Sequence, residues 1–298
     1  MSALKSGFVG DNSVMEADCL GNRDRRHLRK ALRALTAMCL LGLATQAQST
    51  CSRPYTAVVS QLGYTAFQDD NGQLRGIVVD VFHELAQRSG CQITIEDMPA
   101  PRVSAMMGAN QIAMLGLAAP LRNPSPNDIY IPLRAATIDL IIRSEYGAKT
   151  PNAAFTNPRV IFGTLRGASY GGWADNYLRS LPEKRREPTD SIRSIYRKLA
   201  IGRVGATFGF AEVYRLHVDE MRLGNQLRIV PIPEAPRAIG GILINSGIVD
   251  MADAKLLQRT LEMIRDDGSL RRITAQYLGD AKARDELWRK DRDGSNNQ

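Results

Sequence analysis

Histidine and cysteine, the side chains that most often bind transition metals, are scarce in this chain of 298 residues, which holds three and four of them. One histidine and two cysteines precede residue 50, and Cys51 and Cys91 are too far apart in the sequence for a zinc knuckle. Neither a phosphate-binding P-loop nor a glycine-rich dinucleotide fingerprint is present. The sequence therefore predicts no metal site and no cofactor.

A long hydrophobic run is also missing. The most apolar stretch, residues 34–44, follows a basic segment from Arg23 to Arg33 and precedes the small residues 47–49. A membrane-spanning helix needs about 20 apolar residues, so this stretch is too short to span comfortably. The order of basic, apolar and small residues is typical of a cleaved secretory signal, which we place in residues 1–50. A membrane anchor is the alternative interpretation.

Charge of one sign is not concentrated anywhere in the remaining chain. Removing residues 1–50 takes away seven of the 39 basic residues and four of the 31 acidic ones, which lowers the net charge from +8 to +5. The densest basic patch is the short run Lys184–Arg186, and no basic stripe carries interleaved aromatic residues. Nucleic-acid binding needs such a clustered footprint, so we do not expect it.

Strand-like and helix-like segments alternate along the chain, which indicates an α/β fold with parallel sheets and crossover helices. Between them, the proline-rich and asparagine-rich stretch Pro120–Pro132 is predicted to be a loop. The predicted strands are Thr56–Ser60, Cys91–Glu96, Ile112–Leu115, Thr137–Ile142, Val160–Gly163, Val204–Phe208, Leu227–Ile232 and Gly241–Asn245. The predicted helices include Val81–Ser89, Arg102–Gly108, Trp173–Leu181 and Ser191–Ile201.

The segment Ala252–Gly279 carries the most informative pattern. Leu257, Leu261 and Ile264 repeat at helical spacing, and Gly268 stands where a left-handed cap would end that helix. A second short helix then runs to Gly279 in the pattern D-G-S-L-x-x-I-x-x-x-Y-L-G. This pair of helices resembles the C-terminal end of the family 3 periplasmic solute-binding proteins.

The resemblance implies a two-lobed periplasmic-binding-protein fold of the type II flytrap kind, with two hinge strands between the lobes. It also implies a monomer in the periplasm that captures a small molecule, carboxylate-bearing or amino-acid-like, and delivers it to the permease of an inner-membrane ABC transporter. The implied divisions are lobe 1 in residues 51–134 and 241–280, lobe 2 in residues 135–240, and a polar, frayed tail in residues 281–298.

A disulfide is a further implication of the resemblance. An oxidising compartment favours pairing of the two cysteines that remain after the signal is removed, Cys51 and Cys91. They lie next to two predicted strands that are parallel neighbours in the family, which would bring both sulfur atoms to the same edge. We therefore expect a Cys51–Cys91 bond.

Ligands of two-lobed proteins bind in the cleft, at the loops that leave the carboxyl ends of the strands. An Arg side chain and free N–H groups at a helix start favour a carboxylate, and aromatic rings can stack on the ligand. Solvent exposure, helix capping and core packing are the competing explanations for the same residues. The predicted ligand contacts are Gln61, Tyr64, Phe67, Arg102, Gly116, Ala118, Arg122, Arg166, Ser169 and Phe210.

The amino-acid receptors of the family usually carry G-x-T-x-T-x-x-R after the third strand. Here Gly116 fits, but Ala118 and Pro120 replace the threonines, and Arg122 comes one residue before the arginine position. The acid that holds an ammonium group is replaced by Phe210, with Glu212 as the nearest acid. The ligand therefore need not be a zwitterionic α-amino acid.

Two enzyme hypotheses compete with binding. Gly167–Gly171 matches the nucleophile elbow G-x-S-x-G, but His217 is the only histidine after Ser169 and no acid-then-histidine order follows. Some proteins of this fold resemble cyclohexadienyl dehydratases, for which only Glu212 or Glu96 is available as general acid. A receptor that docks on a membrane sensor is the third alternative. We expect a binding protein without catalytic residues.

Overall fold

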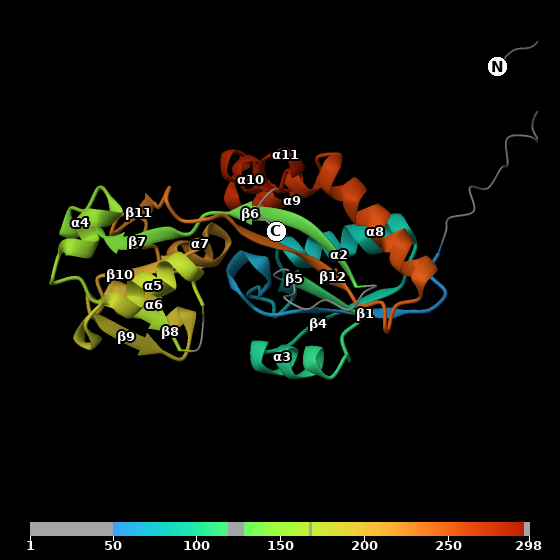
Figure 1. Ribbon diagram of the computed structural model, residues 1–298, viewed down its shortest axis with the longest axis horizontal. Coiled ribbons are helices and arrows are strands. Elements are labelled where there is room, and N and C mark those ends of the chain that lie inside the picture. The colour runs from blue at the N-terminus through green and yellow to red at the C-terminus, as the bar shows by residue number, and fades with distance from the viewer. Residues whose placement is uncertain (1–49, 119–127, 167–168, 295–298) are drawn as a thin grey trace, which may run out of the picture. The chain divides into compact units, whose positions relative to one another are not determined.

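Two five-stranded sheets organise the chain in the computed structural model, which describes residues 50–118, 128–166 and 169–294 (Figure 1). All of these residues belong to one unit, Gln48–Gln298. The first sheet has the strand order β4-β1-β5-β12-β6; β1 pairs parallel with β4 and β5, and β12 pairs antiparallel with β5 and β6. Its strands are β1 (Tyr55–Val59), β4 (Ile93–Asp97), β5 (Met114–Ala118), β6 (Ile129–Ala136) and β12 (Ala238–Ile244).

The second sheet has the order β11-β7-β10-β8-β9. Strand β8 pairs parallel with β9 and β10, whereas β7 pairs antiparallel with β10 and β11. Its strands are β7 (Asp139–Arg143), β8 (Phe162–Leu165), β9 (Arg186–Thr189), β10 (Ala206–Gly209) and β11 (Leu227–Pro231). A two-stranded ribbon, β2 (Phe67–Gln68) with β3 (Leu74–Arg75), follows the 3-10 turn η1 (Gly63–Thr65).

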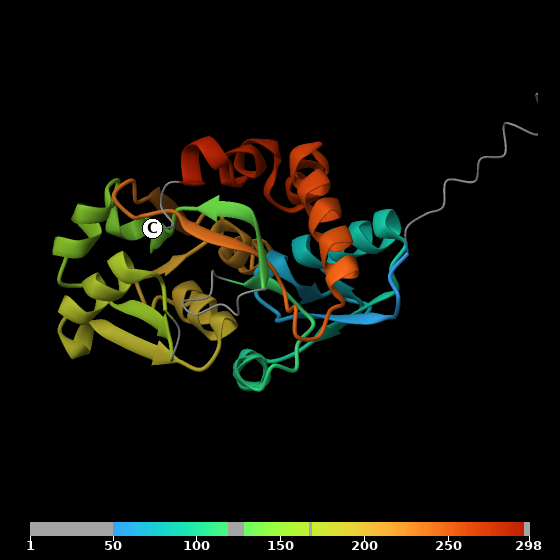
Figure 2. The ribbon, with the colours of Figure 1, turned by 45° about the vertical axis from the view of Figure 1, so that its right-hand side comes forward.

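Helices cover the first sheet with their apolar faces. Helix α2 (Ile77–Ser89) begins four residues earlier than predicted and ends at Gly90, whose φ of 68° gives the left-handed conformation that glycine adopts readily. It packs against α8 (Met251–Asp266), which continues through Gly268 into α9 (Ser269–Leu278) (Figure 2). The helix pair predicted from the C-terminal pattern is confirmed, since Leu257, Leu261 and Ile264 are all fully buried. Helix α3 (Ala100–Gly108) follows β4.

Aromatic side chains fill much of the second lobe. Its helices are α4 (Pro151–Thr156), α5 (Gly172–Ser180), α6 (Ile192–Ala200) and α7 (Ala211–Glu220). The rings of Phe155, Phe162 and Phe208 lie within 6.4 Å of one another, centroid to centroid, and Trp173 and Tyr177 add to the same cluster. Such edge-to-face and offset contacts add to the free energy gained from burial, so this lobe has a core of its own.

Strand β6 was not predicted, because the sequence pattern assigned Pro120–Pro132 to a loop. Pro132 lies within the strand, where a proline cannot donate a ladder hydrogen bond. The strand tolerates it because β6 forms the edge of the sheet, and the register with β12 shifts between Gly240 and Gly241 opposite it. A Cβ atom on Gly241 would lie 2.1 Å from the Ile131 carbonyl oxygen, so only glycine fits there.

The chain passes between the two sheets twice. It leaves β6 at Ala136 and enters β7 at Asp139, and it leaves β11 at Pro231 and enters β12 at Ala238. Ala136 and Ala238 face each other in the β6–β12 ladder, so the two crossings run side by side. These are the two hinge strands of a two-lobed α/β fold, and that fold class is confirmed.

The C-terminal segment differs from the frayed polar tail that its composition indicated. Residues 280–286 form α10 (Asp280–Glu286) and residues 290–293 form α11 (Lys290–Asp293). Ala283, Glu286 and Asp293 are buried although two of them are acidic. Hydrophobic periodicity cannot detect a segment whose burial depends on charge pairs, which explains why this segment was predicted to be frayed.

The predicted disulfide is present. Cys51 and Cys91 are bonded, with their Cα atoms 4.8 Å apart. Strands β1 and β4 are parallel neighbours whose register begins at Tyr55 and Ile93, so the residues that precede them lie at one edge of the sheet. Within the described part of the chain, no helix combines the length and apolar character needed to cross a membrane.

Candidate ligand-binding site

A cavity of about 180 Å³ lies at the carboxyl ends of β1 and β5. Parallel strands β1 and β5 end side by side, which is where open α/β sheets bind their ligands. The walls combine aliphatic and hydroxyl side chains from the strand ends, η1, α2 and α3. They are Val59, Ser60, Leu62, Thr65, Val78, Val103, Ser104, Leu115 and Gly116.

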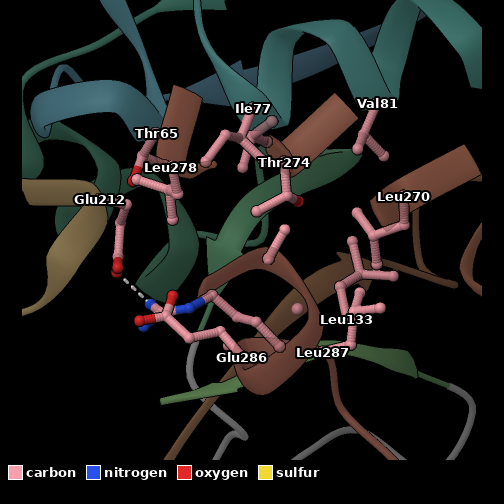
Figure 3. Close-up of a pocket in the computed structure, with 15 residues that line it drawn as sticks. Thr65, Ile77, Val81, Leu133, Glu212, Leu270, Thr274, Leu278, Glu286 and Leu287 are labelled. Atoms are coloured by element: carbon pink, nitrogen blue, oxygen red, sulfur yellow. Dashed lines mark ion pairs between the residues drawn. The ribbon is translucent and has the colours of Figure 1, made fainter. Parts of the chain in front are cut away.

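The polar groups of this cavity are hydroxyls. Ser60 Oγ donates to the Met98 carbonyl at 2.7 Å, which holds the loop after β1 against the loop after β4. Thr65 is 3% exposed, and its Oγ1 makes no hydrogen bond within the described structure. A buried hydroxyl without a partner is costly. Thr65 lines both this cavity and the smaller cavity drawn in Figure 3, so a polar atom in either could supply that partner.

Among the predicted contacts that the structure describes, Gly116 alone lines this cavity. A Cβ atom there would lie 2.3 Å from Val78 Cγ1 and 3.0 Å from Phe82, so the absence of a side chain allows α2 to approach β5. Ala118 ends β5. Arg122 lies outside the described residues.

Gln61 and Arg102 lie near the cavity in sequence but do not line it. Gln61 is exposed and donates from Nε2 to Asp97 Oδ2 at 2.6 Å, which joins the ends of β1 and β4. Arg102 is exposed in the first turn of α3. The sequence analysis did not predict Ser60, Thr65 and Ser104 as ligand contacts, because hydroxyl residues are common in loops. These three stand out only in the folded protein, where the end of β1, η1 and α3 come together around one cavity.

Tyr64 and Phe67 pack on each other and on α9 rather than into the cavity. The rings of Tyr64, Phe67 and Tyr277 are 5.6 to 6.2 Å apart between centroids. The Tyr64 hydroxyl donates to Asp219 Oδ2 of α7 at 3.0 Å, so it connects the first lobe to the second. Burial and this bond to a carboxylate raise the pKa of Tyr64 to about 12.

The predicted contacts on the second lobe form separate local pairs. Arg166 Nε lies 2.8 Å from Asp190 Oδ1, and both side chains are largely exposed. Ser169 Oγ donates to Asp175 Oδ2 at 2.5 Å, and Gly171 rather than Ser169 occupies the N-cap of α5. A second cavity of about 250 Å³ lies beside them, lined by Thr164, Leu165, Tyr170, Asp175, Leu178, Arg179 and Arg186.

Phe210 and Glu212 belong to the hinge region. Phe210 is the N-cap of α7, and the Arg134 guanidinium lies over its ring, 5.2 Å from the centroid. Glu212, only 3% exposed, forms an ion pair with Arg134 (Figure 3). Burial raises the pKa of Glu212 to about 7, because desolvation and the charge of Glu286 outweigh the attraction of Arg134.

These charged groups lie at one end of a small hinge cavity between α2, α9, α10 and β6 (Figure 3). Its remaining walls are mostly apolar, including Ile77, Val81 and Leu270. The cavity volume is about 40 Å³. One water needs roughly 10–15 Å³ on this measure, so the cavity has room for a few waters. It is far smaller than the roughly 150 Å³ of a cavity that accepts benzene. Of these two cavities, the one at the ends of β1 and β5 is therefore the better candidate for a ligand site.

No protein-family model and no curated protein matches the chain. Solved structures do share its fold. A substrate-binding protein of an ABC uptake transporter from Streptococcus pneumoniae, with bound histidine, has a TM-score of 0.61 at 12% identity and covers 76% of this chain and 92% of its own. A structure from work on glutathione import by GshT and the cystine importer TcyBC of Streptococcus mutans has a TM-score of 0.62 at 14% identity, covering 80% and 98%.

An ancestral arginine-binding protein bound to arginine is similar in the same way, with a TM-score of 0.58 at 15% identity and coverage of 76% and 98%. This chain thus spans nearly the whole length of these proteins. The likeness establishes the two-lobed α/β fold of substrate-binding proteins.

Proposed function

We propose that this protein is a solute-binding protein that closes its two lobes on a small molecule and presents it to an ABC importer. The observation that carries the proposal is a cavity at the carboxyl ends of parallel strands, in one of two lobes joined by paired hinge strands. A ligand that touches both lobes binds the closed state more tightly and so drives closure. The similar solved structures, which include proteins with bound histidine and arginine, support an amino-acid-like solute.

The described walls of the cavity favour a ligand held by hydroxyls and apolar contact. Among its nine lining residues none is charged. Arg122, outside the described residues, remains our candidate for a ligand carboxylate. The acids considered for a dehydratase do not line this cavity either: Glu212 lies in the hinge cavity, and Glu96 belongs to β4. This distribution supports binding in preference to catalysis.

The proposal includes the compartment and the partner. The basic and apolar order of residues 23–49 supports export, and the Cys51–Cys91 bond fits an oxidising periplasm. We propose a periplasmic monomer that docks on an inner-membrane permease.

A thermal-shift screen against amino acids, short peptides and organic acids tests the proposed function. A ligand at 100 times its Kd adds about 2.7 kcal/mol to the free energy of unfolding. For a chain of this size we expect the melting temperature to rise by roughly 5–10 °C. A screen in which no solute raises the melting temperature would argue against a small-molecule receptor.

A matched pair of variants on α3 then tests the site. Ser104 and its neighbour Ala105 are both exposed, but of the two only Ser104 lines the cavity. We expect Ser104→Phe to weaken binding of the ligand found in the screen at least tenfold by filling the cavity, and Ala105→Phe to leave Kd within about twofold. Titration calorimetry measures both. Equal affinities in the two variants would place the ligand elsewhere.

A further inference from the structure

The C-terminal segment 280–294 crosses both hinge strands. On β6, the backbone N–H of Trp288 donates to the Leu133 carbonyl at 3.1 Å, and Leu287 forms an isolated antiparallel β-bridge with Arg134. Immediately before β12, Arg237 Nη2 donates to the Asp285 carbonyl at 2.7 Å, and its Nε lies 3.1 Å from Asp293 Oδ1. One short segment therefore binds both connections between the lobes.

The same segment also touches each lobe. On the first lobe, the Arg265 guanidinium of α8 lies 5.0 Å from the centroid of the Trp288 ring. On the second lobe, Lys282 Nζ lies 3.5 Å from Asp139 Oδ2 at the start of β7. The Arg215 side chain of α7 donates to the Leu278 carbonyl, just before the segment, at 2.7 Å. Rotation of the lobes about the hinge would change the distances between these groups.

We propose that residues 280–294 act as a strap across the hinge that restricts how far the two lobes separate, an inference that rests on the proposed binding function. Asp139 and Asp293 are each 2% exposed. Asp139 pairs with Lys282 and accepts from the Tyr214 hydroxyl, and Asp293 pairs with Arg237 and with Arg292 of the segment itself. Arg237 and Lys282 supply part of the compensation of these buried carboxylates, so moving either cation away is unfavourable. States in which the lobes move apart therefore lose strap contacts, and the strap biases the equilibrium towards the arrangement seen here.

The strap depends on charge pairs more than on apolar packing. The hinge cavity lies beneath it, between Leu287 and the helices α2 and α9 (Figure 3). Incomplete packing removes dispersion contacts along that face. Removal of the ionic contacts should therefore loosen the strap without disrupting either lobe's core.

The test is the distribution of distances between spin labels on the two lobes, measured without ligand. Labels are placed on cysteines at the exposed positions Lys255 of α8 and Arg197 of α6, in the full chain with Cys19 and Cys39 replaced by serine. We expect Arg237→Ala to broaden the distribution and to shift its mean by about 2 Å or more, as in hinge rearrangements. The control is Arg284→Ala, because Arg284 is exposed and, among the residues that the structure describes, pairs within α10 with Asp280.

A distribution for Arg237→Ala that superimposes on that of Arg284→Ala, with circular dichroism showing both folded, overturns the proposal. If Arg237→Ala does not fold, Lys282→Met decides, because it removes the ion pairs with Asp139 and with Glu286 and leaves the Arg237 contacts in place. Broadening in Lys282→Met supports the strap, and an unchanged distribution refutes it. Because no ligand is present, a failed strap and a failed ligand screen remain distinguishable.

Discussion

Replacing Cys51 and Cys91 by serine is expected to lower the free energy of unfolding by about 4 kcal/mol. The bond joins residues 40 positions apart, and closing a loop of that length restricts the unfolded chain by roughly this amount in the chain-entropy model. The bond ties the chain before β1 to the chain before β4, which is the edge strand of the first sheet. For a protein of this size the melting temperature should fall by roughly 8–16 °C.

Urea unfolding of oxidised wild type and of the double variant measures the difference. The matched control replaces Cys19 and Cys39, which lie outside the described residues, and should leave the midpoint unchanged. Reductant should lower the wild-type midpoint and leave that of the Cys51→Ser/Cys91→Ser variant where it is. If the double variant unfolds at the wild-type midpoint, the bond does not stabilise this fold.

The second large effect concerns pH and Glu212. Its pKa is raised to about 7 in the folded protein, from an ordinary value near 4.5, chiefly because the carboxyl is buried. The folded state therefore binds this proton more tightly than the unfolded state does. The stability that results is fully present below pH 4.5 and is lost as pH rises through 7. Glu212→Gln stays neutral and should not show this loss.

The quantity to measure is the unfolding free energy of wild type minus that of Glu212→Gln, from urea titrations between pH 5 and pH 8. We expect this difference to fall by roughly 2–3 kcal/mol over that range. Glu212→Gln also removes the ion-pair partner of Arg134, which changes the unfolding free energy at every pH. The test therefore depends on how the difference varies with pH and not on its size at one pH. The control is Glu234→Gln in the exposed loop before β12. A flat difference for Glu212→Gln would show that burial does not hold the proton there.

The disulfide prediction concerns the first lobe, whereas the Glu212 prediction and the proposed strap concern the hinge. The disulfide stabilises the first lobe by itself, whereas Glu212, Arg134 and Lys282 lie where the lobes and the C-terminal segment meet. Glu212, the acid nearest in sequence to the position that Phe210 occupies in place of an ammonium-binding acid, is thus part of the hinge. The cavity that we propose for the ligand lies instead among Ser60, Thr65 and Ser104.

Local sequence determined the elements that bury an apolar face. Leucine and isoleucine spacing located α8 and α9, and Gly268 adopts the expected left-handed conformation with φ of 88°. The alternation of strands and helices led to the α/β class, and resemblance supplied the disulfide pairing. These inferences succeeded because the spacing of apolar residues along a helix or strand shows which of its faces is buried.

Tertiary structure alone decided where the polar residues went. Tyr64 contacts Asp219 and Tyr277 from distant parts of the chain, and β6 is a strand only because β12 pairs with it across Pro132. The C-terminal segment folds because buried Asp293 and Glu286 meet cations that no local pattern connects to them. A charged or hydroxyl side chain has no intrinsic preference for one partner among many, so its role follows from which segments the fold brings together.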